Sequence, residues 1–485
     1  MPSLMSSFVS RGAVLAIARL LNQALALLSP LMLVRLLDIV EYGRYRQFMS
    51  VAMLVTSLGG FALAANLNYL IARSPERAAT DITKTCVLMA LVGALSSIAV
   101  WLLKPWIVPA EIDSSWLLLA TYVFLFLNLE VLVSYWLAQG RSLPVMVYTL
   151  VMTVWRLGTL LGAALYFDDV EMIFVTIVVA EALKNLAIYL WLRSRGLLVL
   201  RWHHDVFREQ VKLVAPLGIG SVLNKANDFG KVVVGTQLGP VPMALYTTAA
   251  YQVPLVNIVQ TSLSDVIFPD MVRRAKKDPR AGFDLWKRAQ TLIFAVICPA
   301  WLLLTYFAEP LIRILFTEAY VDATPYFQVF LLLMLRQCFQ FSVPLRSVAD
   351  NASFATSNAV ALVINGALII ALMPRFGLWG PTLGLVVGQA WTSLYLGRRL
   401  MKRFALSLSE LCEWSKLGLA LAASFVGLAA LYGVQVSVGG PAGALAGIAV
   451  FGLVYLVAAR LILRDEYGYI MRALSRRPSA MKRGT

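Results

Sequence analysis

The chain has 485 residues, 60% of them hydrophobic and 14% charged, and carries a formal net charge of +16. With a mean hydropathy of +0.75, this composition excludes a soluble globular protein and predicts an all-α polytopic membrane protein. The loops are too short for an ATPase or a soluble catalytic domain, and the sequence contains no phosphate-binding loop, zinc-protease motif or nucleophile elbow. The scattered cysteines and the adjacent His203 and His204 predict no metal site. We therefore expect a transporter, not an enzyme, and no cofactor.

Apolar runs long enough to cross a bilayer predict fourteen transmembrane helices. In chain order they lie near residues 12–36, 45–70, 85–103, 115–138, 143–166, 171–192, 212–237, 241–268, 287–307, 325–343, 354–373, 378–397, 414–434 and 441–463. Most basic loop residues fall in alternate loops, such as those around Arg195, Lys276 and Arg399. By the positive-inside rule, both termini should be cytoplasmic. The excess positive charge is then a topology signal and an anchor for anionic lipid, not a sign of nucleic-acid binding.

A weak internal repeat organises these helices. Val34 to Tyr45 aligns with Gly235 to Tyr246 at an offset of 201 residues. The repeat predicts two six-helix lobes in the same orientation, related by an axis along the membrane normal, with cargo bound between them. We expect the first lobe, helices 1 to 6, over residues 1–200 and the second, helices 7 to 12, over residues 205–400. A two-helix appendage and a basic cytoplasmic tail would occupy residues 401–485.

Charged residues inside the predicted spans are the strongest functional signal in the sequence. A Lys or Arg at the centre of a span costs roughly 2.5 to 3.5 kcal/mol if it faces lipid, so these residues should face protein or a water-filled interior. Because basic residues outnumber acidic ones, the interior is net cationic and favours an anionic cargo. In chain order the charged span residues are Arg19, Glu130, Arg156, Glu181, Lys184, Lys225, Asp228, Lys231, Asp265 and Arg336.

Three stretches of the sequence resemble a known family. The run from Val211 to Tyr251 is similar to the seventh and eighth helices of bacterial polysaccharide-precursor flippases of the multidrug/oligosaccharidyl-lipid/polysaccharide exporter (MOP) superfamily. Leu33 to Phe48, with LVRLLDIVEYGRYRQF, and Asn365 to Gly380, with a G-L-W-G turn, resemble the same family. The resemblance covers most of the chain. It implies transport of an undecaprenyl-pyrophosphate-linked oligosaccharide across the cytoplasmic (inner) membrane, for surface or exopolysaccharide synthesis.

The polar residues divide into candidates for cargo binding and for coupling. Arginine and lysine suit a pyrophosphate, whereas amides suit sugar hydroxyls. The candidate substrate-binding residues are Arg19, Asn22, Arg156, Lys184, Lys225, Lys231 and Asn257, and the candidate coupling residues are Asp228, Glu181 and Asp265.

A structural reading of the same residues remains open. Lys184 follows Glu181 by three residues, and Lys225 and Lys231 flank Asp228 at the same spacing, so ion pairs within one helix would neutralise them without cargo. Arg336 lies close enough to a predicted cytoplasmic loop to snorkel toward it. Arg156, by contrast, has no acidic residue within four positions.

Other functions remain alternatives. A peptidoglycan lipid II flippase shares the helix number and the cationic interior. A cation-coupled multidrug antiporter usually has twelve helices and an acidic binding lobe, which the sequence does not favour. A membrane-embedded glycosyltransferase or polymerase would need a large extracellular loop or an acidic catalytic pair, and a scaffold would leave the buried charge unexplained. A polysaccharide polymerase and glycosyltransferases are expected partners of the first function.

Overall fold

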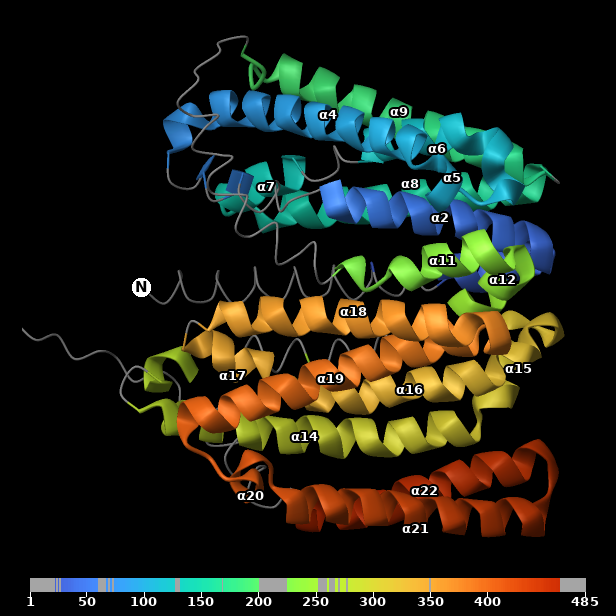
Figure 1. The fold of residues 1–485 in the computed structure, drawn as a ribbon, viewed down its shortest axis with the longest axis vertical. Coiled ribbons are helices and arrows are strands. Elements are labelled where there is room, and N and C mark those ends of the chain that lie inside the picture. The colour runs from blue at the N-terminus through green and yellow to red at the C-terminus, as the bar shows by residue number, and fades with distance from the viewer. Residues whose placement is uncertain are drawn as a thin grey trace, which may run out of the picture. The chain divides into compact units, whose positions relative to one another are not determined.

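The structure, a computed structural model, shows a chain built of helices (Figure 1). It describes residues 22, 25, 28–59, 67–68, 70–71, 74–126, 131–167, 169–199, 225–251, 260, 267–268, 271–275, 278–348 and 350–462. Every regular element within these residues is an α-helix or a short 3₁₀-helix.

Nine helices among the described residues are long and apolar enough to cross a membrane, judged by length and composition. They are Pro75–Leu102, Ala110–Ala138, Leu143–Tyr166, Val170–Ser194, Gly282–Tyr306, Glu318–Ser347, Ala352–Phe376, Trp414–Val438 and Gly440–Arg460. A helix pairs its own backbone N–H and C=O groups, which is why apolar segments of this length take that form in a bilayer. The predicted all-α polytopic membrane protein is confirmed. The number fourteen stays a prediction. Parts of the runs 12–36, 45–70, 212–237 and 241–268 lie outside the described residues, and the run 378–397 forms a helix, α19 (Trp379–Phe404), that is not among the nine.

The described residues divide into two compact units. The first takes its residues from Met1–Ala250, Ile312–Tyr326 and Leu362–Leu385. In it, α2 packs against α4, α6 and α9, and also against α11 and α12 (Figure 1). Phe48 of α2 stacks on Phe174 of α9, with ring centroids 4.2 Å apart. The elements of this unit are α2 (Ile39–Gly59), η1 (Pro75–Arg77), α4 (Ala78–Leu102), α5 (Lys104–Ile107), η2 (Ala110–Ser115), α6 (Trp116–Phe126), α7 (Val131–Ala138), α8 (Ser142–Tyr166), α9 (Val170–Ser194), α11 (Phe229–Leu238), α12 (Pro240–Ala249) and η3 (Glu318–Ala323).

Close backbone packing joins α2 to the α11–α12 corner in the first unit. A Cβ atom at Gly43 would overlap the carbonyl group of Pro240, so α2 approaches the start of α12 too closely for any side chain there. The corner itself is made by Gly239, whose φ of 89° a residue with a side chain rarely adopts. Gln47 Nε2 donates to the Gly235 carbonyl at 2.9 Å. Residues 39–59 and 229–249, far apart in sequence, are therefore held together by close backbone packing and a side-chain hydrogen bond to the backbone.

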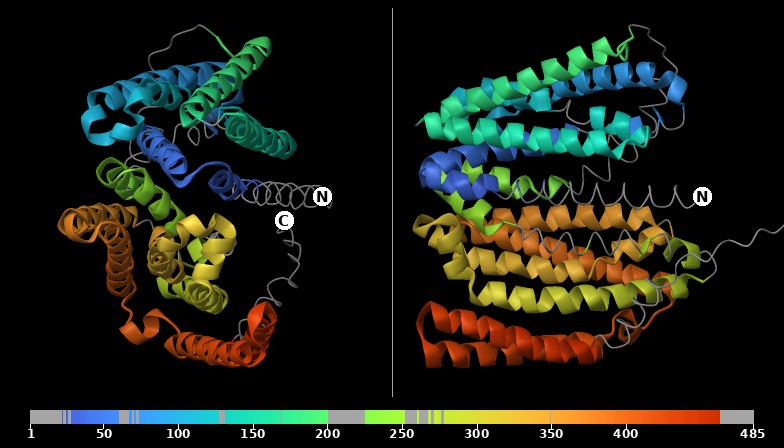
Figure 2. Two further views of the ribbon diagram at one scale, coloured as in Figure 1. Left: turned by 90° about the vertical axis from the view of Figure 1, so that its right-hand side faces the viewer. Right: turned by 180° about the vertical axis from the view of Figure 1, so that it is seen from behind.

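The second unit takes its residues from Tyr251–Leu311, Phe327–Ala361 and Val386–Thr485. Its C-terminal helices α21 and α22 form a hairpin, and α21 packs on α14 (Figure 2). Tyr455 donates to the Ala295 carbonyl at 2.6 Å, and Tyr306 donates to Gln435 at 2.9 Å. Its elements are α14 (Pro279–Tyr306), α17 (Ser342–Ser347), α20 (Leu408–Leu411), α21 (Trp414–Val438) and α22 (Gly440–Ile462), while α15 (Ala308–Phe316), α16 (Thr324–Cys338), α18 (Asn351–Phe376) and α19 (Trp379–Phe404) contribute residues to both units. The predicted lobe boundaries stay a prediction.

Apolar side chains cover the outer faces of several helices. Leu95 on α4, Leu186 on α9 and Leu456 on α22 each expose more than half of their surface. Exposed leucines on every turn are unfavourable in water but favourable against lipid tails. These faces fit a protein surrounded by a bilayer.

Candidate functional site

Four helices of the first unit line a small cavity, and Arg156, an exposed residue, is one of the lining residues. The cavity has a volume of about 20 Å³, enough for about one water molecule. Arg156 reaches it from α8, and the Arg156 Cζ lies 5.8 Å from the centroid of the Phe126 ring. Within the described part of the chain, no acidic side chain forms an ion pair with Arg156. The cavity is lined by Tyr45, Met49, Tyr122, Trp155, Arg156, Thr159, Leu160, Ile177, Ala180 and Glu181.

Two tyrosines give the cavity a polar character that the sequence did not reveal. Tyr45 of α2 and Tyr122 of α6 are buried, and both line the cavity together with Arg156. A guanidinium supplies only donors, whereas phenol hydroxyls can donate and accept. Together with Arg156, these hydroxyls can hold a water molecule or an anionic oxygen in a cavity that Glu181 also lines. Tyr45 lies in the motif that resembles the flippases, but that motif carries no sign that the residue faces Arg156.

Glu181 and Lys184 form an ion pair on α9, three residues apart. The exposed fractions of the two side chains are 10% and 3%. The neighbouring Asn185 donates from Nδ2 to the Leu125 carbonyl at 2.8 Å. The structure therefore brings Arg156, Glu181 and Lys184 together, but Lys184 is engaged by an acid in the way that the ion-pair reading of the sequence anticipated.

Asn22 also lies beside α8. Its Oδ1 accepts a hydrogen bond from the Thr153 hydroxyl, three residues before Arg156. A predicted site residue of the first span thus contacts the helix that carries Arg156.

Lys225, Asp228 and Lys231 form a second group at the start of α11. Lys231 Nζ lies 3.0 Å from Asp228 Oδ1, and both side chains are partly exposed. Lys225 is exposed, and in the described residues it forms no ion pair. The described contacts include no hydrogen bond or ion pair that joins this group to Arg156, Glu181 or Lys184. The predicted site residues of the first unit therefore fall into two separate groups among the described residues.

The remaining predicted residues fall elsewhere. Arg336 is on α16 in the second unit, where its buried Nε has no hydrogen-bond partner among the described residues. Arg19, Asn257, Asp265 and Glu130 lie outside the described residues.

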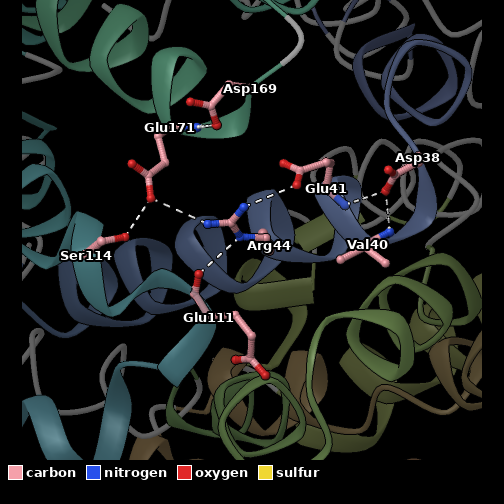
Figure 3. Close-up of polar contacts among 8 residues, drawn as sticks. All are labelled: Asp38, Val40, Glu41, Arg44, Glu111, Ser114, Asp169 and Glu171. Atoms are coloured by element: carbon pink, nitrogen blue, oxygen red, sulfur yellow. Dashed lines mark hydrogen bonds and ion pairs between the residues drawn. The ribbon is translucent and has the colours of Figure 1, made fainter.

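A polar network at one end of α2 was not foreseen from the sequence (Figure 3). Arg44 Nε donates to the Glu111 carbonyl at 3.1 Å, and Arg44 Nη2 lies 3.5 Å from Glu171 Oε1. Arg44 Nη1 also pairs with Glu41 at 3.2 Å, and the Ser114 hydroxyl donates to Glu171 at 2.6 Å. One arginine thus ties α2 to η2 and α9. Arg44 has a structural role, because its N–H groups already contact the Glu111 carbonyl and the carboxylates of Glu41 and Glu171.

Three comparisons place the chain among known proteins. Residues 32–325 match the model of a family described as "Polysaccharide biosynthesis protein". No curated protein matches the chain. Among solved structures, the lipid II flippase MurJ in an inward closed conformation has a TM-score of 0.73 at 15% identity, and the match covers 94% of this chain and 100% of that one.

Transporters of other kinds also match. A mutant of the Vibrio cholerae MATE transporter VcmN has a TM-score of 0.53 at 14% identity, covering 83% of this chain and 98% of that one. A MOP-superfamily transporter from Pyrococcus furiosus has a TM-score of 0.55 at 16% identity, covering 81% and 95%. At these identities the structural matches show a shared fold.

Proposed function

The chain belongs to the polysaccharide biosynthesis protein family, and we propose that it moves an undecaprenyl-pyrophosphate-linked oligosaccharide across the bacterial cytoplasmic membrane by alternating access. Its fold is that of the MOP-superfamily transporters. Flipping changes the side of the membrane on which the cargo lies and makes or breaks no covalent bond, so we propose no catalytic residue. Glycosyltransferases would supply the cargo, and a polymerase would use it on the outer side.

The observation that carries this proposal is the Arg156 guanidinium, which forms no ion pair among the described residues and lines a cavity together with two tyrosines. A guanidinium offers a bidentate fork to a pyrophosphate, and a hydrogen bond to a charged group contributes about 1.5 to 3 kcal/mol. The cavity holds about one water molecule in this state, so pyrophosphate entry requires the cavity to widen. We assign Arg19, Lys225 and Lys231 to the same anion, and Asn22 and Asn257 to sugar hydroxyls. Lys184 would contact the cargo only after its ion pair with Glu181 opens.

Translocation of a labelled lipid-linked oligosaccharide in proteoliposomes tests this proposal. We expect Arg156→Ala to reduce cargo affinity about ten- to a hundred-fold, because it removes one charge-assisted contact, and Arg156→Lys to restore part of it. Arg141→Ala is the matched control, since Arg141 is exposed and immediately precedes the same helix. Wild-type protein that moves no lipid-linked oligosaccharide, or an Arg156→Ala variant equal to the control, would contradict the proposal.

The lipid II flippase remains the second candidate, favoured by the MurJ match over 94% of this chain. The two cargoes share the undecaprenyl pyrophosphate and differ in the attached sugar and peptide. Competition in the same proteoliposomes separates them: unlabelled lipid II should not reduce translocation of the oligosaccharide cargo under our proposal. Complete competition by lipid II at equal concentration would favour the second candidate. A cation-coupled multidrug antiporter would move neither lipid.

We propose the orientation that the basic loops predict, with both termini cytoplasmic in the inner membrane. The cysteines at 86, 298, 338 and 412 are all buried, so introduced cysteines can be labelled against a low background. Asp322→Cys should react with an impermeant maleimide in spheroplasts, whereas Arg195→Cys should react only after permeabilisation. Both residues are exposed, so the reverse pattern would overturn the orientation.

For energy coupling we propose Asp228, with Glu181 and Asp265 as the other candidates. Pyrophosphate arriving beside Asp228 would disfavour its carboxylate and favour proton uptake. Release of the cargo would favour proton loss, and this linkage is reciprocal.

A further inference from the structure

A second cavity, with a volume of about 360 Å³, lies among α7, α8 and α9 in the first unit. Its size falls in the range of small-molecule pockets. Trp136, Tyr148 and Trp191 form one aromatic wall, in which Trp136 meets each of the other two rings edge-on at 5.6 Å. Edge-to-face rings hold one another in place, so this wall is rigid. Aliphatic side chains line most of the remainder.

The aromatic cavity is open on the surface of the unit. Leu183 and Trp155 both line it, and their exposed fractions are 52% and 40%. Further apolar side chains of the same two helices, Val151 and Val154 of α8 and Leu186 of α9, are also exposed. An apolar chain could therefore enter the cavity without crossing a polar rim.

The aromatic cavity is a direct neighbour of the Arg156 cavity. Trp155 lines both of them, and Arg156 follows it in the sequence. The Glu181–Lys184 ion pair connects them as well, because Glu181 lines the first cavity and Lys184 lines the second. A ligand whose anionic group is joined directly to a bulky apolar chain matches this pair of cavities.

We infer that the aromatic cavity binds the first isoprene units of a polyprenyl pyrophosphate, while the pyrophosphate lies at Arg156. This inference rests on the proposed function and adds a specific place for the lipid part of the cargo. A polyprenyl chain is attached to its pyrophosphate without an intervening polar linker, and its methyl branches need a broad cavity. A phospholipid acyl chain has no regular methyl branches, and a polar glycerol ester linker separates it from the phosphate. The apolar wall beside Lys184 and Arg156 therefore favours the prenyl chain.

Photo-cross-linking with a sugar-free probe tests the inference. The full chain in lipid nanodiscs would be irradiated with a diazirine-bearing geranylgeranyl pyrophosphate, and the labelled peptides would be mapped. We expect labelling on α7, α8 and α9 that undecaprenyl pyrophosphate suppresses and excess phosphatidylglycerol does not. Labelling confined to other helices, or equal suppression by phosphatidylglycerol, would overturn the inference, the latter by showing an ordinary acyl-chain site.

Two alanines on α9 provide a matched pair of variants. Ala187 lines the aromatic cavity, whereas Ala182 lines neither cavity, and both are exposed. Ala187→Phe places a ring where the chain would lie, and we expect the Kd of the probe to rise about tenfold, as the exclusion of about two methylene groups would produce. Ala182→Phe adds the same ring elsewhere and should leave the Kd unchanged. Equal Kd values for the two variants would contradict the inference.

The proposed function and this inference fail in different ways. If wild-type protein translocates the oligosaccharide while Ala187→Phe and Ala182→Phe bind the probe equally, only the assignment of the aromatic cavity to the prenyl chain is wrong. If wild-type protein translocates no oligosaccharide, the proposed function is wrong whatever the probe shows. Equal thermal unfolding midpoints of the two variants ensure that a difference in Kd reports on the cavity.

Discussion

Two acid–lysine pairs in the first unit have the same spacing in sequence and different surroundings. Glu181 and Lys184 on α9 expose 10% and 3% of their side chains, whereas Asp228 and Lys231 at the start of α11 expose 45% and 32%. A charge buried without its partner is costly, while a charge that water can reach is not. The same spacing therefore gives a buried, structural ion pair at Glu181 and Lys184 and an accessible cation at Lys231.

The largest expected effect comes from breaking the buried pair. Lys184→Ala leaves the Glu181 carboxylate buried without its partner, which should destabilise the protein by about 3 to 5 kcal/mol. Membrane abundance and the unfolding midpoint in detergent measure this loss. Replacing both members, as in Glu181→Gln with Lys184→Met, should restore most of the abundance. If Lys184→Ala is as abundant as wild type and only transport falls, Lys184 is a cargo ligand and the comparison fails.

The exposed pair should behave in the opposite way. Lys231→Ala should change stability by less than about 1 kcal/mol and, as a lost contact to pyrophosphate, should weaken cargo binding about ten- to a hundred-fold. Lys225→Ala should show the same small change in stability and the same loss of cargo binding. Lys225 forms no ion pair among the described residues. Translocation at limiting cargo, normalised to protein amount, is the measurement. Normal translocation by both variants would show that neither Lys225 nor Lys231 contacts the cargo.

The next prediction concerns the coupling of transport to the proton gradient by Asp228, the acidic member of the exposed pair. Asp228→Asn keeps the side-chain volume and should leave abundance near normal, yet translocation should no longer respond to an imposed pH gradient. The assay compares proteoliposomes with and without the gradient. A full response in the Asn variant would reduce Asp228 to a counter-ion and leave Glu181 and Asp265 as candidates.

The smallest effect is expected at a pair outside the apolar spans. Arg399 Nε lies 3.1 Å from Asp350 Oδ2. Partial burial alone would raise the pKa of Asp350, but hydrogen bonds from Ser353 and Arg399 outweigh it and hold this pKa below its ordinary value. The stabilisation is therefore complete above the ordinary pKa of aspartate and is lost as the pH falls through the lowered one.

Asp350→Asn measures the size of this contribution. Because Arg399 is half exposed, we expect a loss of only about 0.2 to 1 kcal/mol at neutral pH. Unfolding midpoints of the two proteins should converge as the pH is lowered below the ordinary pKa of aspartate. A difference that persists or grows in acid would contradict this assignment.

Much of the fold could be predicted from sequence because it depends on local properties. The apolar runs at 143–166 and 171–192 correspond to α8 (Ser142–Tyr166) and α9 (Val170–Ser194). The gap between the runs 212–237 and 241–268 coincides with the corner at Gly239. The expected family and the polytopic all-α class are confirmed. Run length and the positions of glycine and proline suffice for such features, because a transmembrane helix satisfies its own backbone.

The site was less predictable. The Glu181–Lys184 and Asp228–Lys231 pairs were foreseen as one of two readings, because residues three apart meet on a helix. Their unequal burial was not foreseen, since it depends on which helices cover each pair. Tyr45 and Tyr122 had no signal of their own, because they join the Arg156 cavity from helices distant in sequence. The Arg44 network was missed for the same reason.

The sequence alone determined that this chain is a helical membrane protein with more basic than acidic charge in its apolar segments, because composition and run length set the cost of transfer into lipid. Tertiary structure decided which of those charges are neutralised and which face a cavity. Trp155 and Arg156 are adjacent in sequence, yet Trp155 reaches both cavities and Arg156 lines only the smaller one. Successive side chains on a helix point about 100° apart, and only the packing of α2, α6, α7 and α9 around α8 determines what each of them meets.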